Sequence, residues 1–262
     1  MTSISSNNYD VNAYRQPSRE TAEMAYWLAS AATALVYKTL PSFSNPFLKQ
    51  MTKEHANNHL YKDAFIKSID LSKLKEKGLT LISETNPTTD IGKGLNACFI
   101  PSTKEIKLNL DKASISGFHE LGHAMNNMKG TFGKVLQKLR GPGMYFSGIV
   151  ASIAMLTRNK PKAEKGERRD VKDWIQDNCG KLAFLGMLPT VAEEALASYK
   201  GIKIAKESGL AKPQIQNLKK FYGKAWLSYA GYALVAGVAA FLSNKIMDTF
   251  TRPKRVDEDL RR

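Results

Sequence analysis

One stretch of the chain restricts the possible folds more than any other feature. Residues 225–244, AWLSYAGYALVAGVAAFLSN, are twenty residues without a charge, flanked by lysines. A helix of this length can cross the apolar core of a bilayer, and Trp226 and Tyr229 stand where aromatic residues gather at a membrane interface. Ala233 and Gly237 are four residues apart, which would allow close approach of a second helix, including one from another copy of the chain. We expect a membrane-spanning helix here, and the alternative is a buried helix of a soluble core.

Three further uncharged segments are shorter. Residues 24–37 and 141–157 have fourteen and seventeen residues without a charge, and residues 182–192 cannot cross a bilayer alone. We therefore expect two to four membrane-associated helices. The Lys and Arg bias places the basic stretch 158–172 on the cytoplasmic side, but which side holds the rest of the chain stays open.

The charge balance supports a membrane rather than a nucleic acid as the polyanionic partner. The chain has 39 Lys and Arg against 24 Asp and Glu, a net charge of +15. Its basic residues crowd beside the apolar segments and do not alternate with aromatic residues, as a surface for single-stranded nucleic acid requires. We expect membrane lipid as a partner and no nucleic acid.

The ends and the cysteines carry less information. Residues 1–22 are polar and predict a flexible tail without the pattern of a cleavable signal, and residues 251–262 predict a charged tail. Between them we expect one domain over residues 23–250. Cys98 and Cys179 are far apart in the sequence, which favours two buried free thiols over a disulfide or a thiolate metal site.

A short region of strands precedes the most informative helix. Residues 79–83 and 105–110 alternate apolar and polar side chains, as half-buried strands do, and residues 96–100 predict a third strand joined to the latter by a turn at 101–104. A helix then starts at Asp111 or Ser114 and ends near Gly130. The expected fold class is α+β, mostly helical.

That helix carries the run Phe118-His-Glu-Leu-Gly-His-Ala124. His119 and His123 are four residues apart, so they project from one face of a helix and can reach one zinc ion. Glu120 lies beside the first histidine and can act as a general base toward water that the metal has made more acidic. This pattern predicts a zinc-dependent peptidase site. Gly122 within the helix is explained either by a close approach of another backbone or helix or as a tolerated glycine.

A tetrahedral zinc site needs a third protein ligand. No histidine follows His123, so the candidates are two adjacent carboxylates, Glu193 and Glu194, in an apolar helical setting where a cation must meet them. His55 and His59 are also four residues apart, but their polar neighbours favour a solvated helix face over a second metal pair.

The chain resembles the membrane-bound gluzincins that include the HtpX-type heat-shock proteases and the CAAX prenyl endopeptidases. Three features between residues 75 and 205 carry the resemblance: the HELGH helix, the pattern Glu194-x-x-Ala197-Ser198-x-x-Gly201, which is similar to that group's Glu-x-x-Ala-Asp-x-x-Gly, and the segment Asn96-Ala-Cys-Phe99 with the strand that follows. The resemblance implies a zincin-like core, one zinc ion, and Glu194 rather than Glu193 as the third ligand.

It also implies roles for two further groups of residues. Ser198 stands where the family has an aspartate that supports a zinc-binding histidine, and a hydroxyl in that place weakens the support. The strand 105–110, with Ile106, Leu108 and Leu110, would be the edge strand against which an extended peptide substrate pairs. Tyr199 is a weak candidate for the oxyanion-stabilising residue and is better explained as a packing aromatic.

Taken together, these features predict an integral or tightly associated protein of the inner or cytoplasmic membrane. Zinc held by His119, His123 and Glu194, with Glu120 as base, would hydrolyse peptide bonds in a protein or peptide substrate. One alternative is a non-catalytic membrane scaffold with a peptidase-derived fold. Another is a soluble gluzincin whose apolar helices are internal or mediate assembly.

Overall fold

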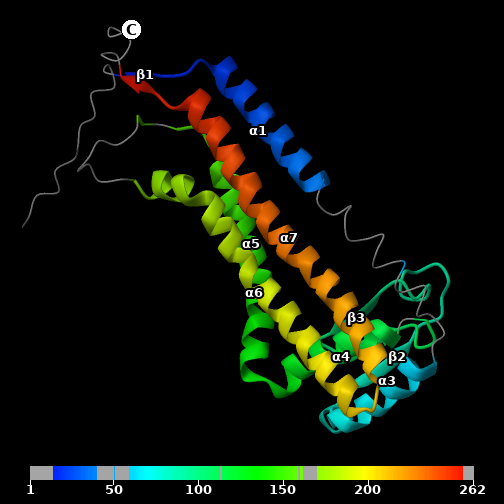
Figure 1. Cartoon of the computed structure of the whole chain (residues 1–262). Helices are drawn as coiled ribbons and strands as arrows, with labels where there is room; N and C mark the ends of the chain where they lie inside the picture. The colour runs from blue at the N-terminus through cyan, green and yellow to red at the C-terminus, as the bar shows by residue number, and fades with distance from the viewer. Residues whose placement is uncertain are drawn as a thin grey trace, which may run out of the picture. The chain divides into compact units, whose positions relative to one another are not determined.

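The structure, a computed structural model, describes residues 14–39, 50, 59–112, 114–158, 160–161 and 170–255. The fold is mostly helical (73%) with a small three-stranded sheet, as expected from the sequence. The main helices are α1 (Arg19–Thr39), α3 (His59–Ser72), α4 (Ser114–Lys129), α5 (Thr131–Ala154), α6 (Val171–Glu207) and α7 (Lys212–Thr251), with a short 3-10 helix η2 at Lys75–Lys77 (Figure 1). The sheet contains β2 (Thr80–Ser83), β3 (Ala97–Ile100) and β4 (Glu105–Leu108), and β1 (Tyr14–Arg15) pairs with β5 (Lys254–Arg255).

The chain divides into two compact units, and the single domain over residues 23–250 stays a prediction. Residues Lys38–Phe146 and Phe184–Val235 form one, which we call the site unit, and Met1–Tyr37, Ser147–Ala183 and Ala236–Arg262 form the other, which we call the helical unit. The three long helices α5, α6 and α7 each contribute residues to both. A hydrophobic pattern reveals a helix but not which of its turns pack together, so this division could not be read from the sequence.

The sheet of the site unit has the strand order β2-β4-β3. Strand β4 pairs with β2 in parallel, Leu81 opposite Ile106, and with β3 in antiparallel, Phe99 opposite Ile106. Strand β4 is therefore central, and the prediction that residues 105–110 form a free edge is wrong. The alternating pattern identified a strand correctly, but the pairing partners of a strand are not visible in its own sequence.

The core of the site unit joins this sheet to α3 and α4. The side chains of Ile106 and Leu108 are fully buried, and Phe65 of α3 meets Phe118 of α4 edge to face with ring centroids 5.5 Å apart. These contacts fix α4 against the sheet. The expected tails 1–22 and 251–262 are partly structured: α1 begins at Arg19, and β1 and β5 pair through backbone groups that leave no apolar pattern in the sequence.

The helical unit contains a buried charge cluster. Arg158 is 2% exposed, and its guanidinium contacts Asp173, Asp177 and Asp248 at 3.1, 2.8 and 3.1 Å. Asn244 accepts a further hydrogen bond from this arginine at 3.1 Å. The cluster ties the segment after α5 to the start of α6 and the end of α7.

Among the described residues, α7 is the one helix that is long and apolar enough to cross a membrane, and a third of its most apolar window is buried. The other apolar segments belong to longer or mixed helices. Residues 141–154 continue α5 and include Pro142, and residues 182–192 lie inside α6 with Pro189. Both prolines therefore sit within helices.

Candidate metal centre

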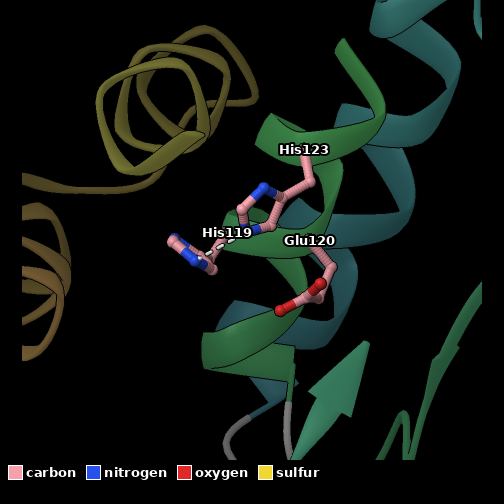
Figure 2. A group of neighbouring side chains, drawn as sticks. All are labelled: His119, Glu120 and His123. Atoms are coloured by element: carbon pink, nitrogen blue, oxygen red, sulfur yellow. Dashed lines mark hydrogen bonds between the residues drawn. The ribbon is translucent and has the colours of Figure 1, made fainter. Parts of the chain in front are cut away.

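Helix α4 presents the two predicted histidines on one face. The His119 and His123 rings lie 4.5 Å apart between centroids, and their Nε2 atoms are 3.0 Å apart (Figure 2). Both imidazoles are largely buried, with side chains 13% and 9% exposed. The one-turn spacing of the motif therefore brings two potential metal ligands to a single point, as helix geometry requires.

Glu194 of α6 completes a triangle of donor atoms. Its Oε2 lies 3.0 Å from His119 Nε2 and 3.5 Å from His123 Nε2. A tetrahedral ion with bonds of about 2.0–2.1 Å separates its ligands by about 3.3 Å, and the three separations here are close to that value. The donor set, two imidazoles and a carboxylate, suits zinc and the other metals that imidazole and carboxylate ligate.

The other ring nitrogens of both histidines have partners that orient them. Ser198 Oγ lies 3.1 Å from His119 Nδ1, and Glu193 Oε1 lies 2.8 Å from His123 Nδ1. When each Nδ1–H donates to these oxygens, each Nε2 lone pair faces the centre of the triangle. The resemblance assigned to Ser198 the support of a histidine, and the structure places its hydroxyl beside His119.

The two adjacent glutamates have different surroundings. Glu193 is fully buried, and its oxygens accept hydrogen bonds from Asn126 at 2.9 Å, Gln137 at 2.9 Å and Arg140 at 2.8 Å besides His123. It reaches the Nδ1 side of His123, whereas Glu194 reaches the Nε2 side, and one imidazole cannot offer both nitrogens to one ion. His123, Glu193 and Glu194 do cluster closely enough for a metal, but this geometry favours Glu194 as the ligand.

Arg140 joins the two carboxylates from the opposite side. Its Nη1 lies 2.8 Å from Glu193 Oε2, and its Nη2 lies 2.8 Å from Glu194 Oε1. A buried acidic pair needs a cation beside it, and zinc is the cation expected from the sequence. Arg140 supplies one such charge, and it leaves Glu194 Oε2 directed toward the histidines.

Glycines allow α4 and α6 to approach closely enough for this arrangement. A Cβ on Gly122 would lie 2.0 Å from the Ala197 carbonyl oxygen, and a Cβ on Gly201 would lie 2.3 Å from the Phe118 carbonyl oxygen. Any larger residue at either position would push the helices apart. Of the two explanations for Gly122, the structure therefore shows the close backbone approach, and the partner is α6, the helix that carries the glutamates.

Glu120 points toward the sheet. The backbone N–H of Phe99 in β3 donates to Glu120 Oε2 at 2.7 Å, and Glu120 is 9% exposed. Burial raises the pKa of its carboxyl group above the ordinary value, while the neighbouring imidazoles act in the opposite direction. The carboxylate thus stands between the histidine pair and the edge of β3 that carries no strand within the described residues.

The charges of the centre stabilise one another. Burial alone would lower the pKa of His123, but its hydrogen bonds to Glu193 and Glu194 raise it to about 10. Burial likewise opposes ionisation of both glutamates, and their hydrogen bonds to the histidines nevertheless lower their pKa values. In this arrangement a proton on His123 supplies positive charge where a metal ion would supply it, so metal binding and protonation compete.

The other residues singled out from the sequence can also be compared with the structure. Ile106 and Leu108 are fully buried in the central strand, and Leu110 is half-buried beside the core. Tyr199 is 66% exposed, so it is neither a packing aromatic nor directed into the centre. The side chains of His55 and His59 lie outside the described residues.

Sequence reasoning missed the contribution of α5. Gln137 and Arg140 are hard to distinguish from the basic residues around them in the run KVLQKLR. The sequence shows only that both share a helix face with Gly133 and Leu136. The structure shows that Gly133 and Leu136 are buried, and polar residues on a buried face need a partner.

Comparison of the chain with protein-family models, with curated proteins and with solved structures finds no match in any of the three. Support for a function therefore comes from the side chains of the centre themselves.

Proposed function

We propose that the chain is a zinc-dependent endopeptidase associated with a membrane. The observation that carries this proposal is the triangle of His119 Nε2, His123 Nε2 and Glu194 Oε2, with separations of 3.0 to 3.5 Å and Glu120 beside it. When bound there, zinc supplies a Lewis acid that polarises a carbonyl group and makes water more acidic.

The protein's own side chains have separate tasks in this reaction. Ser198 and Glu193 hold the two imidazoles in position through their Nδ1 atoms. Glu120 accepts a proton from the attacking water and passes it to the leaving amine. Arg140 holds Glu194 by one oxygen, so that the other oxygen remains directed at the histidines.

Strand β3 replaces 105–110 as the proposed substrate strand. The N–H of Phe99 donates to Glu120, and the N–H of Ala97 donates to Asn96 Oδ1 at 2.9 Å, so neither group pairs with β4. Both groups therefore face the edge of β3 that carries no strand within the described residues. An extended peptide that takes over these donors would run past Glu120.

The membrane assignment is supported by α7. Its segment 225–244 is uncharged, and its length allows a single crossing. We propose that α7 anchors the chain in an inner or cytoplasmic membrane, with one to three of the other apolar helices associated with the same bilayer.

Metal analysis of single variants tests the ligand set. Glu194→Ala should abolish zinc binding because it removes a ligand. Glu193→Ala should retain zinc but bind it about 10- to 100-fold more weakly, because it removes only the partner of His123. Zinc loss confined to Glu193→Ala would contradict the assignment of Glu194.

A second measurement separates an enzyme from a scaffold. Glu120→Gln should keep zinc and lose peptide cleavage, since the amide cannot accept the proton. Phe99→Pro should raise the Michaelis constant without loss of zinc, and unchanged kinetics would exclude the β3 edge as the substrate strand. An unmutated protein that binds zinc but cleaves no peptide would favour the non-catalytic membrane scaffold. Release of the protein without detergent would favour a soluble gluzincin.

A further inference from the structure

The first part of α5, residues 131–146, has two opposite faces. The inner face carries Gln137 and Arg140, which hold the glutamates of the metal centre. The outer face carries a row of exposed apolar side chains, which we call the α5 stripe: Phe132 (68% exposed), Val135 (47%), Leu139 (45%) and Phe146 (45%). Steps of three, four and seven residues place these four on one side of a helix.

The inner face is packed so closely against α4 and α6 that α5 cannot rotate about its own axis. A Cβ on Gly133 would lie 2.8 Å from Asn126 Cβ in α4, and a Cβ on Gly143 would lie 2.3 Å from the Gly186 carbonyl oxygen in α6. These contacts flank Gln137 and Arg140 along the helix. The exposed stripe is therefore a fixed feature of the surface, and a row of large apolar side chains on a surface marks an interaction site.

Charge indicates what covers the stripe. Lys134 and Lys138 are exposed and lie beside it on the helix, and the sequence has no Asp or Glu between Glu120 and Glu164. A helix with an apolar stripe and a purely basic border is suited to the surface of an anionic bilayer. Symmetric pairing with a second copy would instead bring the same lysines together.

We propose that residues 131–146 of α5 lie on an anionic membrane surface, with the stripe among the acyl chains and the two lysines at the phosphates. This inference rests on the proposed membrane association and deepens it. Gln137 and Arg140 of this segment contact Glu193 and Glu194 of α6. The metal centre therefore lies at that surface. Its substrates are then extended protein segments next to the membrane rather than freely dissolved peptides.

Site-specific fluorescence on the full chain tests this placement without zinc or cleavage. In a parent with Cys98→Ser and Cys179→Ala, single cysteines at Val135, Leu139, Leu234 and Glu76 receive an environment-sensitive dye. The protein is reconstituted in phosphatidylcholine vesicles with or without phosphatidylglycerol. Brominated lipid should quench the labels at Val135 and Leu139, whereas the label at Glu76, an exposed residue of η2, should respond only to iodide in water.

The label at Leu234 separates failure of this inference from failure of the membrane proposal. Leu234 lies in the uncharged segment of α7 and is 56% exposed. Lipid quenching at Leu234 with none at Val135 and Leu139 would overturn the placement of α5 alone. Absence of lipid quenching at all three positions would overturn the membrane association as well.

Two further outcomes decide the nature of the surface. Each basic residue near an anionic surface is worth about a fivefold shift in equilibrium, so Lys134→Gln with Lys138→Gln should lower the ratio of docked to undocked protein by about 25-fold. Equal quenching with and without phosphatidylglycerol would refute the electrostatic part. Protection of Val135 from both quenchers, with crosslinking between copies, would show a protein interface and overturn the proposal.

Discussion

Gly122→Ala is the sharpest test of the way the metal centre is built. The added methyl group would lie 2.0 Å from the Ala197 carbonyl oxygen, a backbone atom that cannot rotate away. Real contacts of this kind are not shorter than about 3.0 Å, so α4 and α6 must separate by about 1 Å at this point. Metal–ligand distances tolerate only about 0.2 Å, and Glu194 stands on α6 while both histidines stand on α4.

The expected result is a loss of zinc affinity with a smaller effect on folding. Alanine favours the helix by about 1 kcal/mol over glycine, which offsets part of an overpacking cost of about 1–3 kcal/mol. The displaced carboxylate, in contrast, should weaken zinc binding by at least about 100-fold, or about 2.7 kcal/mol. Competition with a coloured chelator measures this affinity, and circular dichroism checks that the helices form.

Gly223→Ala is the matched control. It makes the same change within a helix of the same unit, but nothing lies within 4 Å of the added Cβ. It should bind zinc like the unmutated protein and unfold at the same or a slightly higher temperature. Equal zinc affinity of the Gly122→Ala and Gly223→Ala proteins would refute the claim that helix separation controls the centre.

Three further substitutions have distinct expected effects. Ser198→Ala removes the partner of His119 Nδ1 and should weaken zinc binding about 10- to 100-fold in the same chelator assay, while Ser198→Asp should strengthen it. Arg140→Met leaves two buried carboxylates without their arginine, and it should destabilise the zinc-free protein by about 3–5 kcal/mol in urea unfolding, with zinc restoring part of the loss. Arg158→Met breaks the charge cluster of the helical unit and should cost a similar amount at unchanged zinc affinity; a large change in that affinity would contradict the independence of the metal centre from this cluster.

The short-range features of the centre could be predicted because they depend on helix geometry alone. His119 and His123 share a face whenever residues 114–129 are helical, and Glu120 necessarily lies beside them. The apolar run 225–244 likewise required a long helix, which α7 provides. In each case the spacing along the chain already defines the spatial relation.

The partners of these residues were decided by tertiary structure. The choice between Glu193 and Glu194 depends on which nitrogen of His123 each one reaches, and residue spacing does not contain that information. The role of Arg140 depends on how α5 rotates against α6, and the central position of β4 depends on which strands pair with it. The sequence by itself therefore determined the ligand-bearing helix and its chemistry, because neighbours along a helix are fixed by its pitch. Only the packing of separate segments decided what completes the centre, because contacts between distant residues depend on the shape and burial of every surface between them.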